Sequence, residues 1–552
     1  MSAEDLQIID SRCPSLGGRP LLFRTVLFLW TVFGLNRVSL TQDSQNLLRL
    51  NAATSGFTPI GVKECAACHS NPSPIYEQLK ITRFVRLVEA KEWLQDKHSY
   101  AYQLVRHDLS EHEMSLPERA PNRLSLAIQN RLGWASGDGN FQKKCLTCHA
   151  GLDANSFAQS SELSKLNLEY GVQCEACHGP GSEYTQTSLH QQVEWRKKTS
   201  AEKAKHGMWD MASPSTIASV CASCHVGNIV QRRFVTHDMY AAGHPVLPPF
   251  ELSTFLDAMP PHWKSIQDKP LKASTDSESP KTFELQKEYY AAHYDLVDQT
   301  DAVQRAIQSD FERTKRSMIG GLAVNDVGLG LIHAIAEPAS PYPWGDFAVY
   351  DCMGCHQELT KGKLRWRQED RIPGRPFPAS WLSIEHSMDE SNKPTVSELK
   401  KQLFASFNAV PFGDPIKITA MAQSHAKGFS DRLAGWSSKE RRIMTVADVQ
   451  RWLQSLSNQR SGQLGDYWVA KQTGWMVTVA VEELIAHKLI RADRVQSQLA
   501  ELSELLALKL AIPQKSSVLE SQSQVLNLAN TFNSARCDQL IQDLISIALE
   551  AR

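Results

Sequence analysis

Cysteine and histidine recur in one fixed pattern along this 552-residue chain. Two cysteines stand three positions apart and a histidine follows the second directly, and this Cys-x-x-Cys-His pattern occurs five times. The cysteines of the five motifs are Cys65 and Cys68, Cys145 and Cys148, Cys174 and Cys177, Cys221 and Cys224, and Cys352 and Cys355. The histidines that complete them are His69, His149, His178, His225 and His356. Such a cysteine pair can bind zinc, exchange disulfides or anchor a haem.

The constant histidine separates these three chemistries. The chain has 18 His in 552 residues, so finding His after all five pairs by chance has a probability of roughly a few in 10⁸. A structural zinc site takes four ligands, commonly from two pairs, and gives no reason for the histidine. A thioredoxin-like dithiol needs only one pair. Covalent haem uses every position, because both thiols form thioethers and the next imidazole binds the iron. We therefore predict five covalently bound c-type haems (Fe).

Composition sets few further limits on function. The net charge is −1, the hydrophobic content is 42%, and no basic stripe indicates a nucleic-acid partner. Haem changes the charge balance, because each haem brings two propionates. We therefore expect the haem-loaded protein to be acidic.

The N-terminus has the pattern of an export signal. An uncharged apolar run at 25–35 is too short to span a bilayer, and Arg19 and Arg24 precede it. We expect a signal peptide at 1–41; an uncleaved anchor and a buried helix are the alternatives. No later segment is expected to cross a membrane. A periplasmic location agrees with the motifs, because c-type haem is attached outside the bacterial inner membrane.

The segments that position the motifs are predicted to be helical. Apolar residues recur at helical spacing over 75–94, and no stretch shows the sustained alternation of a strand, so the predicted fold class is all-α, with short helices wrapping the haems. The expected parts are a signal peptide (1–41), a tetrahaem cytochrome core (42–265), a linker or insertion (266–315), a fifth-haem segment (316–393) and a C-terminal bundle of four or five helices (394–552).

Two features of the C-terminal part favour helices that pack without a cofactor. Thr445 with Asp448, and Ser517 with Glu520, have the spacing of capping boxes at helix starts. Cys537 lies outside the five motifs, in a helical pattern, and is expected to be an ordinary buried thiol.

Each haem iron has a sixth position, and 13 further histidines could fill it. The place of four of them in the chain favours them as ligands: His98, His190, His237 and His244. His244 follows Ala241, Ala242 and Gly243, whose small side chains let the backbone approach a porphyrin. Weaker candidates are His262 and His333; the remaining histidines are expected at the surface or in packing.

The stretch "GVQCEACHGPGSEY" at 171–184, followed by "CASCHVG" and "HDMYAAGHP", resembles the multihaem cytochromes of the c-552/c-554 type. With "YDCMGCH" at 350–356, it is similar to large pentahaem relatives predicted from planctomycete-like bacteria. The resemblance implies an all-helical haem-wrapping fold, periplasmic electron transfer, and His98, His190, His237 and His244 as ligands. Tetrahaem members have three bis-histidine haems and one open haem. This chain departs from them in its additional haem and in Gln357, where relatives often carry histidine.

Two function classes remain open from the sequence. The first is a periplasmic electron carrier that serves redox partner proteins, so that the chain is not itself an enzyme. The alternative is a haem-dependent oxidoreductase acting on a nitrogen or sulphur oxyanion, or on hydroxylamine, at one open haem. No Cys-x-x-Cys-Lys motif occurs, which argues against the pentahaem nitrite reductase reaction. A scaffold whose bundle docks a partner is a third reading. The catalytic residues, electron donor, electron acceptor and oligomeric state are not determined by the sequence.

Overall fold

The structure is a computed structural model, and the residues it describes all fall within Asp43–Arg552. It describes residues 56–70, 88–105, 123–134, 144–151, 167–185, 190, 195, 198–263, 310–340, 342, 344–350, 352, 356, 396–407, 409, 412–437, 443–458, 466–509 and 518–551. The predicted signal peptide, Cys355 and the Ser517 cap lie outside these residues.

The described residues are helical, which confirms the predicted all-α class. They contain no strand, and their only β-type pairing is an isolated bridge between Asn228 and Arg233. The part of the chain with the first four motifs contains the α-helices α2 (Val62–His69), α4 (Glu89–Trp93), α6 (Arg123–Arg131), α8 (Leu146–His149), α10 (Cys174–His178), α11 (Ser200–Ala204), α12 (Pro214–His225), α13 (His237–Ala242) and α14 (Leu252–Asp257). Its 3-10 helices are η3 (Lys97–Leu104) and η5 (Leu168–Tyr170).

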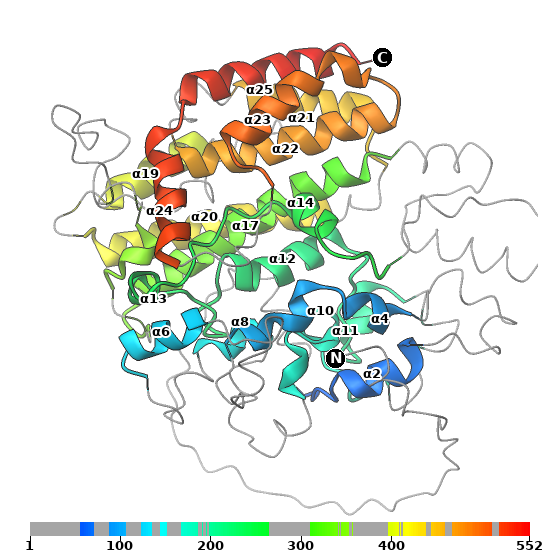
Figure 1. The fold of residues 1–552 in the computed structure, drawn as a ribbon, viewed down its shortest axis with the longest axis vertical. Coiled ribbons are helices and arrows are strands. Elements are labelled where there is room, and N and C mark those ends of the chain that lie inside the picture. The colour runs from blue at the N-terminus through cyan, green and yellow to red at the C-terminus, as the bar shows by residue number, and fades with distance from the viewer. Residues whose placement is uncertain are drawn as a thin grey trace, which may run out of the picture. The chain divides into compact units, whose positions relative to one another are not determined.

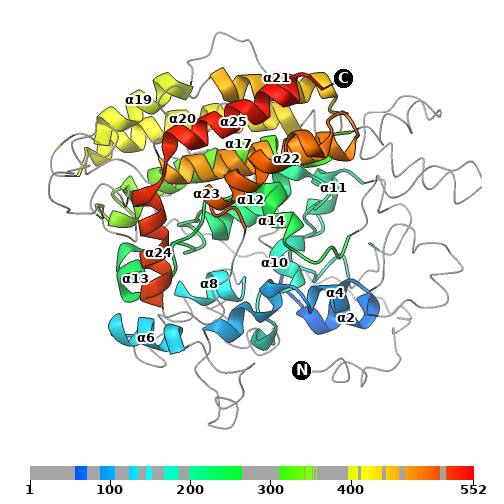
Figure 2. The same ribbon diagram turned by 45° about the horizontal axis from the view of Figure 1, so that its top comes forward.

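The later part of the chain has longer helices (Figure 1). Its described α-helices are α17 (Glu312–Ala336), α19 (Val396–Phe407), α20 (Pro415–Ser437), α21 (Val446–Asn458), α22 (Tyr467–Ala486), α23 (Gln496–Leu505), α24 (Val518–Thr531) and α25 (Ser534–Leu549). Its 3-10 helices are η8 (Phe347–Val349) and η12 (Ala492–Arg494). Helix α25 lies against α21, α22 and α23, as both views show (Figures 1 and 2).

Two local predictions for this later part are confirmed. Thr445 and Asp448 exchange hydrogen bonds at the start of α21: the Thr445 amide donates to Asp448 Oδ2 (2.8 Å), and the Asp448 amide donates to Thr445 Oγ1 (3.3 Å). Cys537 is fully buried in α25.

Helix α17 is the centre of the packing. It contacts α12, α14, α20 and α22, so it is covered on several sides and can be apolar around most of its circumference. Met318, Leu322 and Leu329 are at most 1% exposed. By length and composition α17 could cross a membrane, which corrects the expectation that no segment after the N-terminus would pass that test. However, 83% of its most apolar stretch is buried inside the protein.

Helix α12 connects the haem motifs to this packing, because it contacts α17 and ends at the fourth motif. Ile217, Ala218 and Ala222 of α12 belong to the same hydrophobic core as Trp452 and Leu484. The described residues of the expected cytochrome core and of the expected C-terminal bundle therefore share one hydrophobic core.

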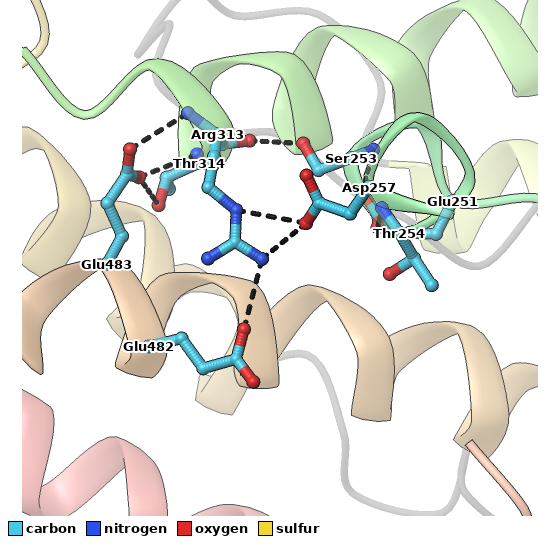
Figure 3. A network of polar contacts seen from close by, with 8 residues as sticks. All are labelled: Glu251, Ser253, Thr254, Asp257, Arg313, Thr314, Glu482 and Glu483. Atoms are coloured by element: carbon cyan, nitrogen blue, oxygen red, sulfur yellow. Dashed lines mark hydrogen bonds and ion pairs between the residues drawn. The ribbon is translucent and has the colours of Figure 1, made fainter. Parts of the chain in front are cut away.

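Charged groups join α14, α17 and α22 (Figure 3). The Arg313 guanidinium donates to Asp257 through Nε (3.1 Å) and to Glu482 through Nη2 (3.0 Å). Glu483 accepts from the backbone amides of Arg313 (2.9 Å) and Thr314 (2.8 Å), so a carboxylate of α22 caps the start of α17. This network fixes α14, which leads to His262, relative to the two longer helices.

Helices α14 and α17 approach closely at a glycine. A Cβ atom placed on Gly320 would lie 2.7 Å from Cβ of Leu252, a separation that side chains do not tolerate. Glu251 caps α14 by accepting from the amides of Ser253 (3.1 Å) and Thr254 (2.7 Å). Packing and capping therefore set the position of α14 together.

Candidate functional site

The first four motifs occupy equivalent places, since in each the histidine is the last residue of an α-helix: α2, α8, α10 or α12. One helical turn brings the first and fourth residues of a motif to the same face, and the fifth follows beside them. The local fold thus presents two thiols and one imidazole together, as covalent haem attachment requires. In the fifth motif the structure describes Cys352 and His356, and the His356 amide donates to the Cys352 carbonyl (2.7 Å).

The third motif holds the start of the first. Glu175, the second residue of "CEACH", is only 8% exposed and accepts from the amides of Ile60 (2.9 Å), Gly61 (2.7 Å) and Gly181 (2.7 Å). Burial raises the pKa of Glu175, and these amides oppose the rise. Gln173 Oε1 accepts from the Val62 amide, the first residue of α2 (2.9 Å). A carboxylate and an amide side chain therefore cap the helix that carries His69.

Two glycines with positive φ bracket the third motif. Gly171 (φ 60) lets the chain pass so close to residue 98 that an added Cβ would lie 2.4 Å from the His98 carbonyl oxygen. Gly179 (φ 82) would meet the Gly207 carbonyl oxygen at 2.2 Å in the same way. The Val172 amide donates to the His98 carbonyl (2.9 Å). Gly171 and the Val172 hydrogen bond thus place His98 beside the third motif, whereas Gly179 lets the chain after the motif approach Gly207.

Thiols of different motifs are neighbours. Cys65 of the first motif and Cys174 of the third lie close together, since each is the main cause of the shift in the other's pKa. The same holds for Cys148 of the second motif and Cys224 of the fourth. The first four motifs therefore lie close together in two pairs, and haems attached to them would be near enough for electrons to pass.

A second histidine lies opposite the histidine of the first, third, fourth and fifth motifs. Ring centroids are separated by 6.4 Å for His69 and His190, 6.3 Å for His178 and His262, 6.2 Å for His225 and His98, and 6.4 Å for His356 and His237. For the second motif, the evidence that two histidines lie near each other is electrostatic. Burial is the main cause that lowers the pKa of His244, and the charge of His149 is the next.

These separations fit two imidazoles that share one metal ion. An imidazole nitrogen binds a first-row metal at about 2.0–2.1 Å. A five-membered ring with bonds of about 1.33 Å has a radius of about 1.1 Å. Two rings on opposite sides of one iron would thus have centroids about 6.3 Å apart, which agrees with the four measured pairs.

The outer nitrogens of five of these histidines are held by acceptors, as is usual for metal-binding histidine. Each contact is made through Nδ1. It joins His69 to Glu89 Oε2 (3.0 Å), His98 to Asp96 Oδ1 (2.9 Å), His149 to the Ala101 carbonyl (3.1 Å), His190 to the Tyr184 carbonyl (2.9 Å) and His244 to the Pro245 carbonyl (2.8 Å). When Nδ1 carries the ring proton and donates a hydrogen bond, Nε2 is unprotonated and can bind a metal.

Burial also favours the neutral, metal-binding imidazole. It lowers the pKa of His178, His225 and His244 to about 4 each. In each case the positive charge of the facing histidine lowers the pKa further. His98 differs: burial is the largest cause and opposes its protonation, but the hydrogen bond to Asp96, the charge of Asp96 and the charge of Cys224 together outweigh burial and raise the pKa of His98.

The structure brings together residues that are distant in the sequence. His98, His190, His237 and His244, favoured from the sequence, each lie near a motif histidine. His262 was only a weak candidate, yet it faces His178. The local sequence "MPPHW" shows only that two prolines stiffen the chain there. It does not indicate which histidine His262 faces.

Other histidines have contacts that explain them without a haem. His333 contacts the Thr419 carbonyl through Nδ1 (3.2 Å) and lies near Glu337. His206 bonds Glu183 (2.8 Å). His425 is buried at 3% exposure in α20. Within the described parts of the chain, no group of three or more His, Cys, Asp or Glu residues is placed to hold a metal ion.

Comparison with known proteins agrees with this site. Residues 64–179, which include the first three motifs, match the family described as "Cytochrome c554 and c-prime". No curated protein and no solved structure matches the chain. The match implies covalently bound c-type haem and electron transfer in general. The haem motifs and the match over residues 64–179 together support a c-type cytochrome.

Proposed function

We propose that this protein is a periplasmic pentahaem cytochrome that carries electrons between redox partner proteins, and that every haem iron has two histidine ligands. The observation that carries the proposal is the second histidine near each motif histidine. The proposed ligand pairs are His69 with His190, His149 with His244, His178 with His262, His225 with His98, and His356 with His237. When bound, each haem would supply a one-electron couple.

The remaining residues of the site support a carrier. A histidine on each side of the iron leaves no position for a substrate, while anchors in close contact keep the haems near enough for electron transfer. The protein would set each potential through the partners of the histidines and through nearby charge. Partner proteins would be a donor and an acceptor in the same compartment.

Spin-state counting tests the ligand pairs. A pyridine haemochrome assay should give five haems per chain, and the EPR spectrum of the oxidised protein should show low-spin signals only. His262→Ala should convert one haem to high spin while all five stay attached, because Cys174, Cys177 and His178 are unchanged. His206→Ala is the matched control and should leave the spectrum unchanged, because His206 bonds Glu183. An unchanged His262→Ala spectrum would contradict that ligand assignment.

The same spectra decide between a carrier and the enzyme alternative. A wild-type high-spin haem that binds nitrite or hydroxylamine would favour an enzyme. The haem of the second motif is the first one to test for a high-spin signal. The pairing of His149 with His244 rests on the lowered pKa of His244, whereas the other pairs rest on ring distances. Location is tested separately: the mature chain should begin near Gln42 and be recovered from the periplasm. Haem-loaded protein that forms in the cytoplasm without export would contradict this location.

A further inference from the structure

A buried positive charge lies among the haem motifs. Arg233 is 5% exposed and follows the fourth motif by eight positions. Its guanidinium donates to the Thr147 carbonyl (2.9 Å), the Ser223 hydroxyl (2.7 Å) and the Gly151 carbonyl (3.2 Å). Thr147 and Ser223 lie inside the second and fourth motifs, and Gly151 follows the second. The side chain therefore ties these two motifs together.

All three acceptors are neutral. No described carboxylate pairs with Arg233, although a buried guanidinium is costly unless a negative charge compensates it. The carboxylate that acts on the same region is Asp96, whose Oδ1 accepts from both the backbone amide and the ring of His98. Three hydrogen bonds thus orient Arg233, and its charge is available to another group.

The charge lies beside two motifs. The guanidinium is within hydrogen-bond distance of Thr147 in the second motif, Gly151 after it and Ser223 in the fourth motif. One buried side chain therefore places its charge between the attachment segments of two haems.

The local fold is built to insert this side chain. The chain turns back after the fourth motif, and Asn228 and Arg233 exchange backbone hydrogen bonds at 2.6 and 2.8 Å. Arg232, at the turn, has φ 58, a strained conformation for a residue other than glycine. Arg232 is exposed while Arg233 points inward, so two adjacent arginines have opposite environments.

We propose that Arg233 is the internal positive charge of the haem cluster: it balances haem propionates at the second and fourth motifs and holds the reduction potentials of these haems high. The proposal rests on the covalent haems of the proposed function. A cation stabilises the reduced haem, whose net charge is more negative by one unit. At an effective dielectric constant of about 20, one charge about 12 Å away changes such an equilibrium by roughly tenfold, about 59 mV for one electron.

Three variants test the proposal by potentiometric titration, with the haem count measured first. Arg233→Met should lower the potentials of the haems at these two motifs by roughly tenfold in equilibrium constant. Arg233→Lys keeps the charge and should keep the potentials close to wild type. Arg232→Gln removes the adjacent exposed charge and should change little, because solvent screens it.

The outcomes are distinct from those of the proposed function. A haem count of zero in the wild type refutes the proposed function. Five attached haems with unchanged potentials in Arg233→Met overturn the role of Arg233 alone. An Arg233→Lys shift as large as that of Arg233→Met also overturns it, since the residue would then act through its fork of hydrogen bonds. If Arg233→Met does not load haem, Arg233→Lys is the deciding variant. Wild-type potentials in haem-loaded Arg233→Lys support the proposed role of the positive charge. A loss of haem in both variants overturns that role.

Discussion

Glu175→Ala should destabilise the contact between the first and third haem motifs. The substitution removes the carboxylate that accepts from Ile60, Gly61 and Gly181. The amides of Gly61 and Gly181 are bonded in buried positions, so water does not easily replace the acceptor. The start of α2, which carries His69, then loses most of its capping.

The expected loss is about 3 kcal/mol. A hydrogen bond to a charged group contributes about 1.5–3 kcal/mol, and an unsatisfied buried donor costs about 1–3 kcal/mol. The loss of three such bonds would by itself exceed about 3 kcal/mol. However, the substitution also removes a buried carboxylate, and the cost of desolvating that group, which raises its pKa, no longer opposes folding. Glu175→Gln keeps one acceptor oxygen and should lose about 1–2 kcal/mol.

Denaturant unfolding followed by far-UV circular dichroism measures these losses, since a change in midpoint at constant slope reports stability. Glu64→Ala is the matched control: Glu64 is exposed in the first turn of the same helix, and its removal should cost under about 1 kcal/mol. If Glu175→Ala falls within about 0.5 kcal/mol of this control, the capping role assigned to Glu175 is wrong.

Three further outcomes are expected. Glu89→Gln should raise the potential of the first haem by roughly tenfold in equilibrium constant, because a neutral partner makes His69 a weaker donor to oxidised iron; an unchanged potential in redox titration would count against the Glu89 contact. Gly171→Ala should shift the His98 backbone and alter the low-spin EPR signal of the fourth haem, since its Cβ would lie 2.4 Å from the His98 carbonyl; a wild-type signal would refute this. Lys471→Met should stabilise the protein at pH 7 by up to about 3 kcal/mol, because burial lowers the Lys471 pKa from 10.5 to about 8. Between about pH 8 and 10.5, Lys471 is protonated in the unfolded chain but not in the folded one, so folding of the wild type releases a proton. The stability of the wild type should therefore rise with pH over this range, and the rise should be absent in the variant.

The sequence determined the chemistry because each haem motif is local. Five consecutive residues contain both thiols and one imidazole, and one helical turn presents them together whatever the rest of the chain does. The all-α class and the Thr445 cap could be predicted for the same reason, since apolar spacing and capping depend on neighbours within a few positions.

Only the tertiary structure decided which histidines face each other. His98 lies opposite His225, and His262 opposite His178, across long stretches of chain whose path depends on packing. The roles of Glu175 and Arg233 were hidden for the same reason: each looks like a surface charge in the sequence, and each is buried against a motif far along the chain. Position along a chain does not encode such proximity, because the core around α17 and close approaches such as that at Gly171 form only when distant segments pack together.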